Sequence, residues 1–117
     1  MSKILLIDDD EDMLEMTGRW LEKAGYSVLK AASGSEALDL LSQDKPDLIL
    51  LDYAMPKMNG PEVLQALKSD DNYKNIPVLY RTGMDDTNLG DDGLADGVVP
   101  KAEGKPGLLK AVGNVLL

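Results

Sequence analysis

Short apolar runs alternate with longer segments of mixed polarity along the whole chain. The runs are rich in Ile, Leu and Val, which favours strands over helices in segments of this length. The predicted strands cover residues 3–7, 26–31, 47–51, 76–80 and 98–99. The run at 47–51 (DLILL) is almost entirely apolar. A strand that is buried on both faces of a parallel sheet has this pattern.

Between these runs, apolar residues recur at intervals of three and four, which is the spacing of one helix face. The predicted helices cover about 13–24, 33–41, 61–68 and 85–95, and a last one starts at Pro106. Ser33 and Glu36 form a capping box, and Gly25 suits a helix end. Gly90 and Gly93 weaken the fourth helix, because glycine has a low helix propensity.

Strand and helix alternate five times, and this order predicts the fold class. Alternation at this spacing favours a parallel sheet with helices on both faces. We expect an α/β protein with a five-stranded, doubly wound, flavodoxin-like sheet. The chain has 117 residues and no linker, repeat or low-complexity segment, so one domain over 1–117 is expected.

Composition excludes several classes of function. The chain has no Cys and no His, which removes disulfides, thiolate metal sites and thiol nucleophiles. A net charge of −9 without a Lys/Arg cluster argues against a nucleic-acid partner. The first apolar run is short and is followed by acids, unlike a signal peptide or a membrane span. We therefore expect a cytoplasmic protein without a membrane partner.

Polar side chains follow four of the predicted strands. They are Asp8 and Asp9, Asp52, Thr82 and Lys101. The carboxyl ends of parallel strands meet at one edge, where ligands bind in such folds. Two carboxylates about 4 Å apart repel by about 4 kcal/mol at an effective dielectric near 20, so a hard cation such as Mg²⁺ is expected among them. One carboxylate would stay free to attack phosphorus, with the Lys and Thr binding phosphoryl oxygens.

Two longer motifs give this arrangement a family resemblance. ILLIDD at 4–9 and LILLDYAMPKMNG at 48–60, together with Thr82 and Lys101, resemble the receiver domains of two-component response regulators. The resemblance covers essentially the whole chain. It implies a single-domain response regulator, a phosphoprotein that accepts a phosphoryl group on Asp52. The donor would be a sensor histidine kinase or a histidine phosphotransfer protein.

The resemblance also assigns roles to the other site residues. It implies that Asp9 binds Mg²⁺ directly, that Asp8 acts mainly through water, and that the Ala54 carbonyl completes the protein ligands. Thr82 and Lys101 would contact the phosphoryl group. Such a receiver promotes its own phosphorylation and dephosphorylation, and is not an enzyme for other substrates. Its changed surface signals to a downstream protein, or it passes the phosphoryl group along a phosphorelay.

Three positions depart from the family pattern. Val98 stands where the family has a switching aromatic residue, and Ala102 where a Pro usually follows the Lys in a cis peptide. We expect a trans bond there, because a cis bond without Pro costs about 3 kcal/mol. Arg81 replaces an apolar residue. We hypothesise that it reaches an acid in the segment 85–91 (Asp85, Asp86 or Asp91) and takes over part of the switching.

Two other functions remain open at this point. A degenerate receiver would bind a partner constitutively, and the altered switch residues favour that reading while the intact acids oppose it. Asp8 and Asp10 also resemble the paired aspartates of haloacid-dehalogenase phosphatases. That reading leaves Asp52 without a role, and the chain is short for that fold and its substrate cap.

Overall fold

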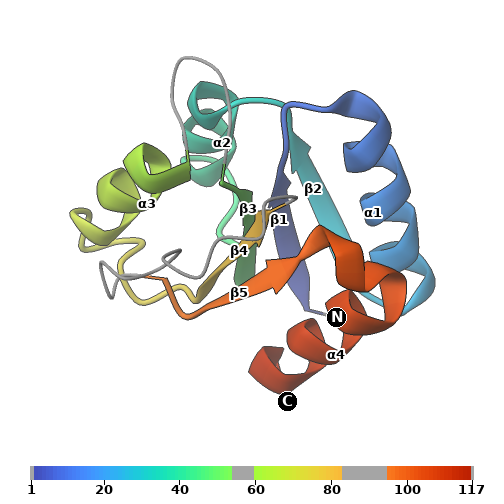
Figure 1. Ribbon diagram of the computed structural model, residues 1–117. Coiled ribbons are helices and arrows are strands. Elements are labelled where there is room, and N and C mark those ends of the chain that lie inside the picture. The colour runs from blue at the N-terminus through green and yellow to red at the C-terminus, as the bar shows by residue number, and fades with distance from the viewer. Residues whose placement is uncertain (1, 54–59, 83–94, 117) are drawn as a thin grey trace.

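The computed structural model describes residues 2–53, 60–82 and 95–116 (Figure 1). The strands are β1 (Lys3–Ile7), β2 (Ser27–Ala31), β3 (Leu48–Asp52), β4 (Val78–Thr82) and β5 (Gly97–Pro100). The helices are α1 (Glu11–Lys23), α2 (Gly34–Leu41), α3 (Gly60–Lys68) and α4 (Gly104–Leu116), with a 3₁₀ turn, η1 (Lys101–Glu103), before the last.

The five strands form one parallel sheet in the order β2-β1-β3-β4-β5. The predicted fold class is therefore confirmed. Strand β4 starts two residues later than predicted, at Val78 instead of Ile76. Pro77 explains the shift, because it has no N–H to donate to β3; the β3–β4 pairing begins with Ile49 opposite Val78.

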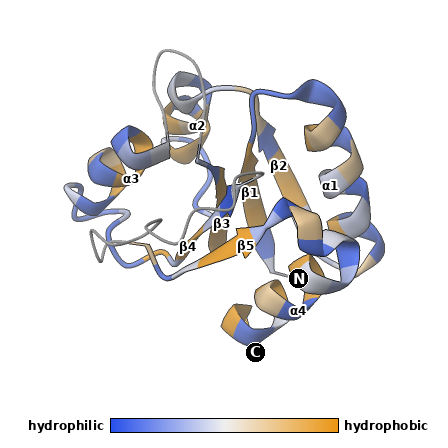
Figure 2. Ribbon diagram, in the orientation of Figure 1, coloured by the Kyte–Doolittle hydropathy of each residue, from blue (hydrophilic) through white to orange (hydrophobic). Residues whose placement is uncertain are grey.

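Helices cover both faces of the sheet and divide the core into two parts. On one face α2 and α3 pack over Leu5, Ile49 and Leu51. On the other, α1 and α4 pack over Leu6, Leu50 and Leu79. Figure 2 shows the apolar strands between helices whose outer surfaces are hydrophilic. Because side chains alternate along a strand, successive residues of β1, β3 and β4 belong to opposite faces.

The helices largely follow the predicted spans. Ser33 caps α2 by accepting from the Glu36 N–H at 3.1 Å, and α2 ends at Leu41 as predicted. The last helix begins at Gly104, two residues before Pro106, because proline is tolerated in the first turn of a helix. The predicted helix over 85–95 lies almost wholly outside the described residues. None of the helices in the described ranges is long and apolar enough to cross a bilayer.

The start of α3 lies against the end of β3. The Gly60 N–H donates to the Tyr53 carbonyl at 2.8 Å. A Cβ on Gly60 would come within 2.7 Å of the Asp52 carbonyl oxygen and 2.9 Å of the Tyr53 Cα. Only glycine permits this approach without a backbone shift. The contact fixes the start of α3 against the end of β3.

Candidate functional site

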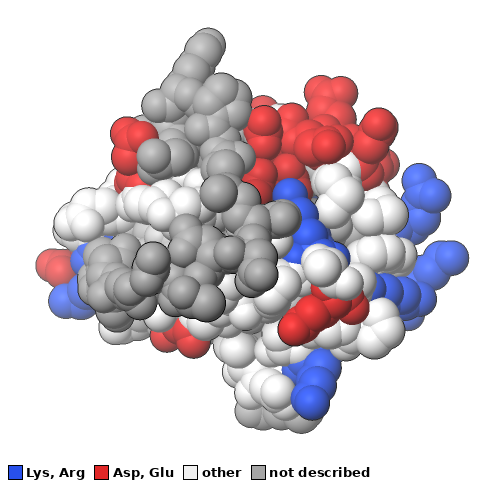
Figure 3. Space-filling model, viewed as in Figure 1, with Lys and Arg blue, Asp and Glu red and all other residues white. Residues whose placement is uncertain are grey.

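Three carboxylates meet at the carboxyl edge of the sheet. Asp8 and Asp9 follow β1, and Asp52 is the last residue of β3, the strand beside β1. One oxygen from each lies within 4.8 Å of the others. Figure 3 shows acidic side chains gathered at this end of the molecule. The structure thus brings together the three acids that the sequence placed at strand ends, here called the acidic cluster.

Two members of the acidic cluster are buried and one is open to solvent. Asp8 is 2% exposed and Asp52 is 6% exposed, whereas Asp9 is exposed. The Asp8 Oδ1 accepts a hydrogen bond from the Asp10 N–H at 3.0 Å, which holds this carboxylate in place. Asp10 in turn caps α1 by accepting from the backbone N–H groups of Asp12 and Met13. The acidic cluster is therefore tied to the first turn of α1.

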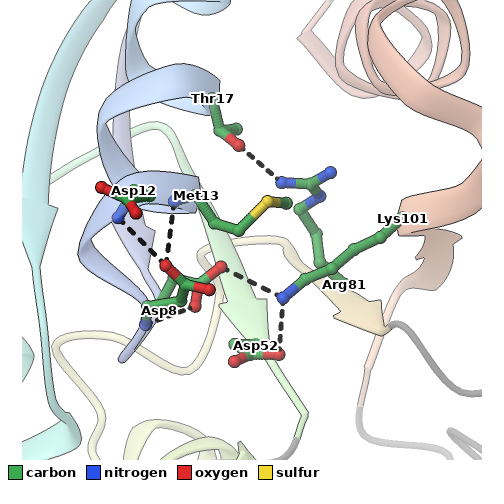
Figure 4. A network of polar contacts seen from close by, with 8 residues as sticks. Asp8, Asp12, Met13, Thr17, Asp52, Arg81 and Lys101 are labelled. Atoms are coloured by element: carbon green, nitrogen blue, oxygen red, sulfur yellow. Dashed lines mark hydrogen bonds and ion pairs between the residues drawn. The ribbon is translucent and has the colours of Figure 1, made fainter.

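Lys101 supplies a positive charge to the buried pair. It opens η1, directly after β5, and its Nζ lies 3.2 Å from the Asp8 Oδ2 and 3.4 Å from the Asp52 Oδ1 (Figure 4). No peptide bond in the described ranges is cis, so the bond to Ala102 is trans, as expected. Lys101 reaches both carboxylates from this trans loop.

The electrostatics of Asp52 reflect its burial first and the neighbouring negative charge second. Burial, followed by the charge of Asp8, raises the pKa of Asp52 to about 7, although Lys101 lowers it. Hydrogen bonding with Asp9 and Asp8 acts in the same direction as burial. One ammonium therefore does not compensate three neighbouring carboxylates. The acidic cluster can accept a further cation at neutral pH.

The donor set of the acidic cluster fits a hard divalent cation. Carboxylate oxygens are the protein ligands that Mg²⁺ and Ca²⁺ prefer, and Mg²⁺ commonly uses only one or two of them, with water and phosphate oxygens. Asp9 is open to solvent and leaves room for such ligands. Burial and then the charge of Asp8 raise the pKa of Asp52, so a further cation would favour its ionised form. These residues therefore suit Mg²⁺.

Thr82 lies at the same edge of the sheet. It is the last residue of β4 and is 4% exposed. The residue before it, Arg81, pairs with Asp52 in the β3–β4 register.

Val98, which replaces the usual aromatic residue, is half-buried and packs with the α2/α3 side of the core. Its register partner is Tyr80, a buried aromatic residue whose ring meets that of Tyr53 edge-on at 5.3 Å. The aromatic contact in this region thus joins β4 to the residue that directly follows β3.

Arg81 is buried, 2% exposed, on the face covered by α1 and α4. Its Nη1 donates to the Thr17 Oγ1 at 2.8 Å (Figure 4). The acids proposed as its partners lie in 83–94, outside the described residues. Among the described residues, its hydrogen-bond partner is a hydroxyl on α1. Burial lowers the pKa of Arg81, while the charges of Asp8 and then Asp52 raise it.

Two contributors to this region were missed by the sequence reasoning. Thr17 lies within the predicted helix over about 13–24 and Gly60 ends the motif at 48–60, and the sequence pattern assigns neither a role at the site. A hydroxyl in the apolar spacing of a helix was the available signal, because a buried hydroxyl needs a hydrogen-bond partner. The proposed ligand carbonyl of Ala54 lies in 54–59, outside the described residues.

Comparisons with known proteins point to a single family. The response regulator receiver domain family matches residues 4–112. Response regulator MprA of Mycolicibacterium vanbaalenii is 40% identical over 102 residues, which are 85% of this chain and 43% of that protein. MprA of Mycobacterium avium is 39% identical over the same share of this chain and 44% of its own length. The chain therefore spans less than half the length of these curated relatives.

Solved structures support the same grouping. The Vibrio cholerae chemotaxis protein CheY4 superposes with a TM-score of 0.93, at 34% identity and 99% coverage of both chains. The response regulator TrrA of Thermotoga maritima, solved in complex with Mg²⁺-BeF, superposes with a TM-score of 0.89 at 28% identity. That match covers 99% of this chain and all of TrrA.

Proposed function

Because the chain belongs to the response regulator receiver domain family, we propose that it accepts a phosphoryl group on Asp52 and signals through the change that follows. The observation that carries the proposal is the meeting of Asp8, Asp9 and Asp52 with Lys101 at one edge of the sheet. Response regulators as a group interact with histidine kinases and downstream targets. The donor proposed here is a phosphohistidine on a sensor histidine kinase or a histidine phosphotransfer protein.

In the proposed reaction, an Asp52 carboxylate oxygen attacks the phosphorus of the phosphohistidine. An O–P bond forms, the N–P bond breaks, and the imidazole leaves with the electron pair of that bond. Asp52 must be ionised to attack, and Lys101, 3.4 Å away, favours its ionised form. Mg²⁺ held by Asp8, Asp9 and Asp52 would neutralise charge on the transferring group.

After transfer, Lys101 and Thr82 bind the phosphoryl oxygens. Lys101 already lies between Asp8 and Asp52, so it needs little movement to contact a group on Asp52. Charge-assisted hydrogen bonds of this kind are about twice as strong as neutral ones. The Ala54 carbonyl remains a proposed further ligand of the metal. A cytoplasmic location, and the absence of turnover on other substrates, belong to the same proposal.

The test is the intact mass of the protein after incubation with acetyl phosphate and Mg²⁺. The wild type is expected to gain one phosphoryl group, and Asp52→Asn none. Asp71→Asn, an exposed aspartate outside the acidic cluster, is the matched control and should gain the group like the wild type. Absence of any gain in the wild type would contradict the proposal.

A degenerate receiver, which binds a partner without phosphorylation, is the second candidate. One observation favours it, which is that Arg81 is a second cation near the acidic cluster. The charges of Asp8 and Asp52 raise the pKa of Arg81, which indicates this proximity. Magnesium binding separates the two, because a working receiver requires the metal. A phosphatase is distinguished from a receiver by its sustained turnover of a generic phosphate ester, which a receiver lacks.

A further inference from the structure

Arg81 is the buried charge that the proposed phosphoryl transfer does not use. It stands opposite Asp52 in the β3–β4 register, one strand away. Strand alternation places it on the same face as Leu79, under α1 and α4. Its exposed fraction is 2%, which is unusual because arginine is rarely fully buried without a paired charge.

The guanidinium has few partners for a buried cation. Nη1 donates to the hydroxyl of Thr17, which is 0% exposed on α1. Nε has no hydrogen-bond partner, and the ion pairs among the described residues include none to Arg81. Its hydrogen-bond partner among the described residues is therefore a neutral oxygen. Leaving a buried donor unsatisfied destabilises the fold, and more so when the group is charged.

The acidic cluster provides the remaining compensation at longer range. Asp8 and Asp52 both favour the charged form of Arg81, against the effect of burial. A guanidinium does not lose its proton in proteins, so Arg81 cannot respond to a change in these charges by becoming neutral. It can respond only through its position and its hydrogen bonds. The Thr17 hydrogen bond and the acidic cluster therefore compete for the same cation.

Helix α1 is connected to the acidic cluster at two levels. At its start, Asp8 accepts from the Asp10 N–H and Asp10 caps the helix. Further along, Thr17 receives the hydrogen bond from Arg81, about 9 Å along the axis from Glu11 at 1.5 Å per residue. Figure 4 shows the guanidinium directed toward α1, while the Lys101 ammonium is directed toward the carboxylates.

We infer that the hydrogen bond between Arg81 and Thr17 couples the charge of the acidic cluster to the middle of helix α1. A phosphoryl group on Asp52 adds negative charge, attracts the guanidinium and weakens its bond to Thr17. Mg²⁺ alone has the opposite effect, because it repels the guanidinium toward Thr17. Arg81 is thus a positioning residue, and α1 responds to phosphorylation. The phosphoryl part of this inference rests on the proposed function.

Two substitutions at Thr17 test the coupling without altering the acidic cluster. Thr17→Val removes the hydroxyl and keeps the branched shape, whereas Thr17→Ser keeps the hydroxyl. Trp20 is the only tryptophan, lies three residues further along α1 and is half-buried, so its fluorescence reports on this helix. Amide hydrogen exchange in α1 is the second readout.

Each protein is compared with Mg²⁺ alone and with Mg²⁺ plus beryllium fluoride, which mimics the phosphoryl group. In the wild type and Thr17→Ser, beryllium fluoride should speed exchange of the amides near Thr17 about threefold or more and shift Trp20 emission. In Thr17→Val the difference between the two conditions should vanish, although acetyl phosphate still phosphorylates it. A merely structural Thr17 would change both conditions equally.

An equal response in Thr17→Val and the wild type would overturn the inference. Phosphorylation of the wild type without any response of α1 would overturn it too, and would leave the proposed function standing. If the protein takes up no phosphoryl group and Mg²⁺ has no effect on α1, both the inference and the proposed function are overturned. If Thr17→Val does not fold, Arg81→Met removes the donor instead, and its phosphorylated fraction must lack the α1 response.

Discussion

The two faces of the sheet differ in how they treat polar groups. The α2/α3 face carries a continuous apolar core, in which Leu5, Ile49, Leu51 and Val78 are fully or almost fully buried. Away from the carboxyl ends of the strands, the α1/α4 face is equally apolar. At its carboxyl end, however, Asp8, Asp52 and Arg81 take the positions where the alternation would place further apolar residues.

The contrast shows where this fold tolerates electrostatic cost. Buried charges cost several kcal/mol unless they are paired, and the raised pKa of Asp52 indicates incomplete pairing. Both faces therefore supply hydrophobic stabilisation, while the carboxyl end of the α1/α4 face also holds charges that a ligand can compensate. Pairs of titratable groups with such environments are typical of functional sites.

The largest effect is expected when the positive charge is removed from the carboxyl end of the α1/α4 face. Lys101→Met removes the cation that lies 3.2 Å from Asp8 and 3.4 Å from Asp52. The rate of phosphorylation by acetyl phosphate should fall about 100-fold, the size of effect seen when one stabilising donor is lost. Intact mass against time measures the rate. Lys105→Met, an exposed lysine on α4, should keep the wild-type rate; equal losses in the two variants would contradict the assignment.

The next largest effect is expected in how the free energy of unfolding depends on pH, because among the described residues a buried acid lies on only one of the two faces. An aspartate ionises near 3.8 when unfolded and, at Asp52, near 7 in the fold. Because the folded pKa is raised, this contribution to stability is full below 3.8 and is lost as the pH rises through about 7. The metal-free wild type should lose up to about 4 kcal/mol over this range relative to Asp52→Asn.

Urea denaturation in the presence of a chelator, at a series of pH values, measures this difference. Adding Mg²⁺ should recover part of the lost stability above pH 7, since binding to the folded state stabilises it. Parallel pH profiles for the wild type and Asp52→Asn would show that Asp52 is not the group responsible.

Packing on the apolar side gives the third prediction. Gly60→Ala places a methyl group within 2.7–2.9 Å of the β3–α3 backbone, and should destabilise the protein by about 1–3 kcal/mol. Gly113→Ala on α4 meets nothing within 4 Å and should stabilise by about 0.5–1 kcal/mol. Chemical denaturation measures both. The same sign for the two variants would break the distinction between the tight end of α3 and the open α4.

The smallest expected effect is a gain in stability at Arg81. Arg81→Met replaces a buried, incompletely paired cation by an apolar chain, a change that is often neutral or stabilising. With saturating Mg²⁺ to compensate the carboxylates, we expect a gain of about 1 kcal/mol by denaturation. Leu79→Met on the same face is the control and should lose up to about 1 kcal/mol. A larger loss at Arg81 than at Leu79 would mean that Arg81 is not an incompletely paired charge at the carboxyl end of this face.

Most of the fold and much of the acidic cluster could be predicted, because both depend on local patterns. Apolar runs marked all five strands, and acids directly after a run marked the carboxyl edge. The predicted start of β4 was wrong by two residues because Pro77 has no N–H to donate to β3, and the last helix began before Pro106. The fourth predicted helix and the Ala54 ligand remain predictions.

The sequence by itself determined the alternating strands and helices, and the placement of Asp8, Asp9 and Asp52 at strand ends. The tertiary structure decided which face Arg81 occupies and that its partner is Thr17, 64 residues away. A shift of one residue along a strand reverses the face of every side chain, so local sequence does not settle that choice. A long charged side chain also takes its partner from whichever element packs above it, and packing decides which element that is.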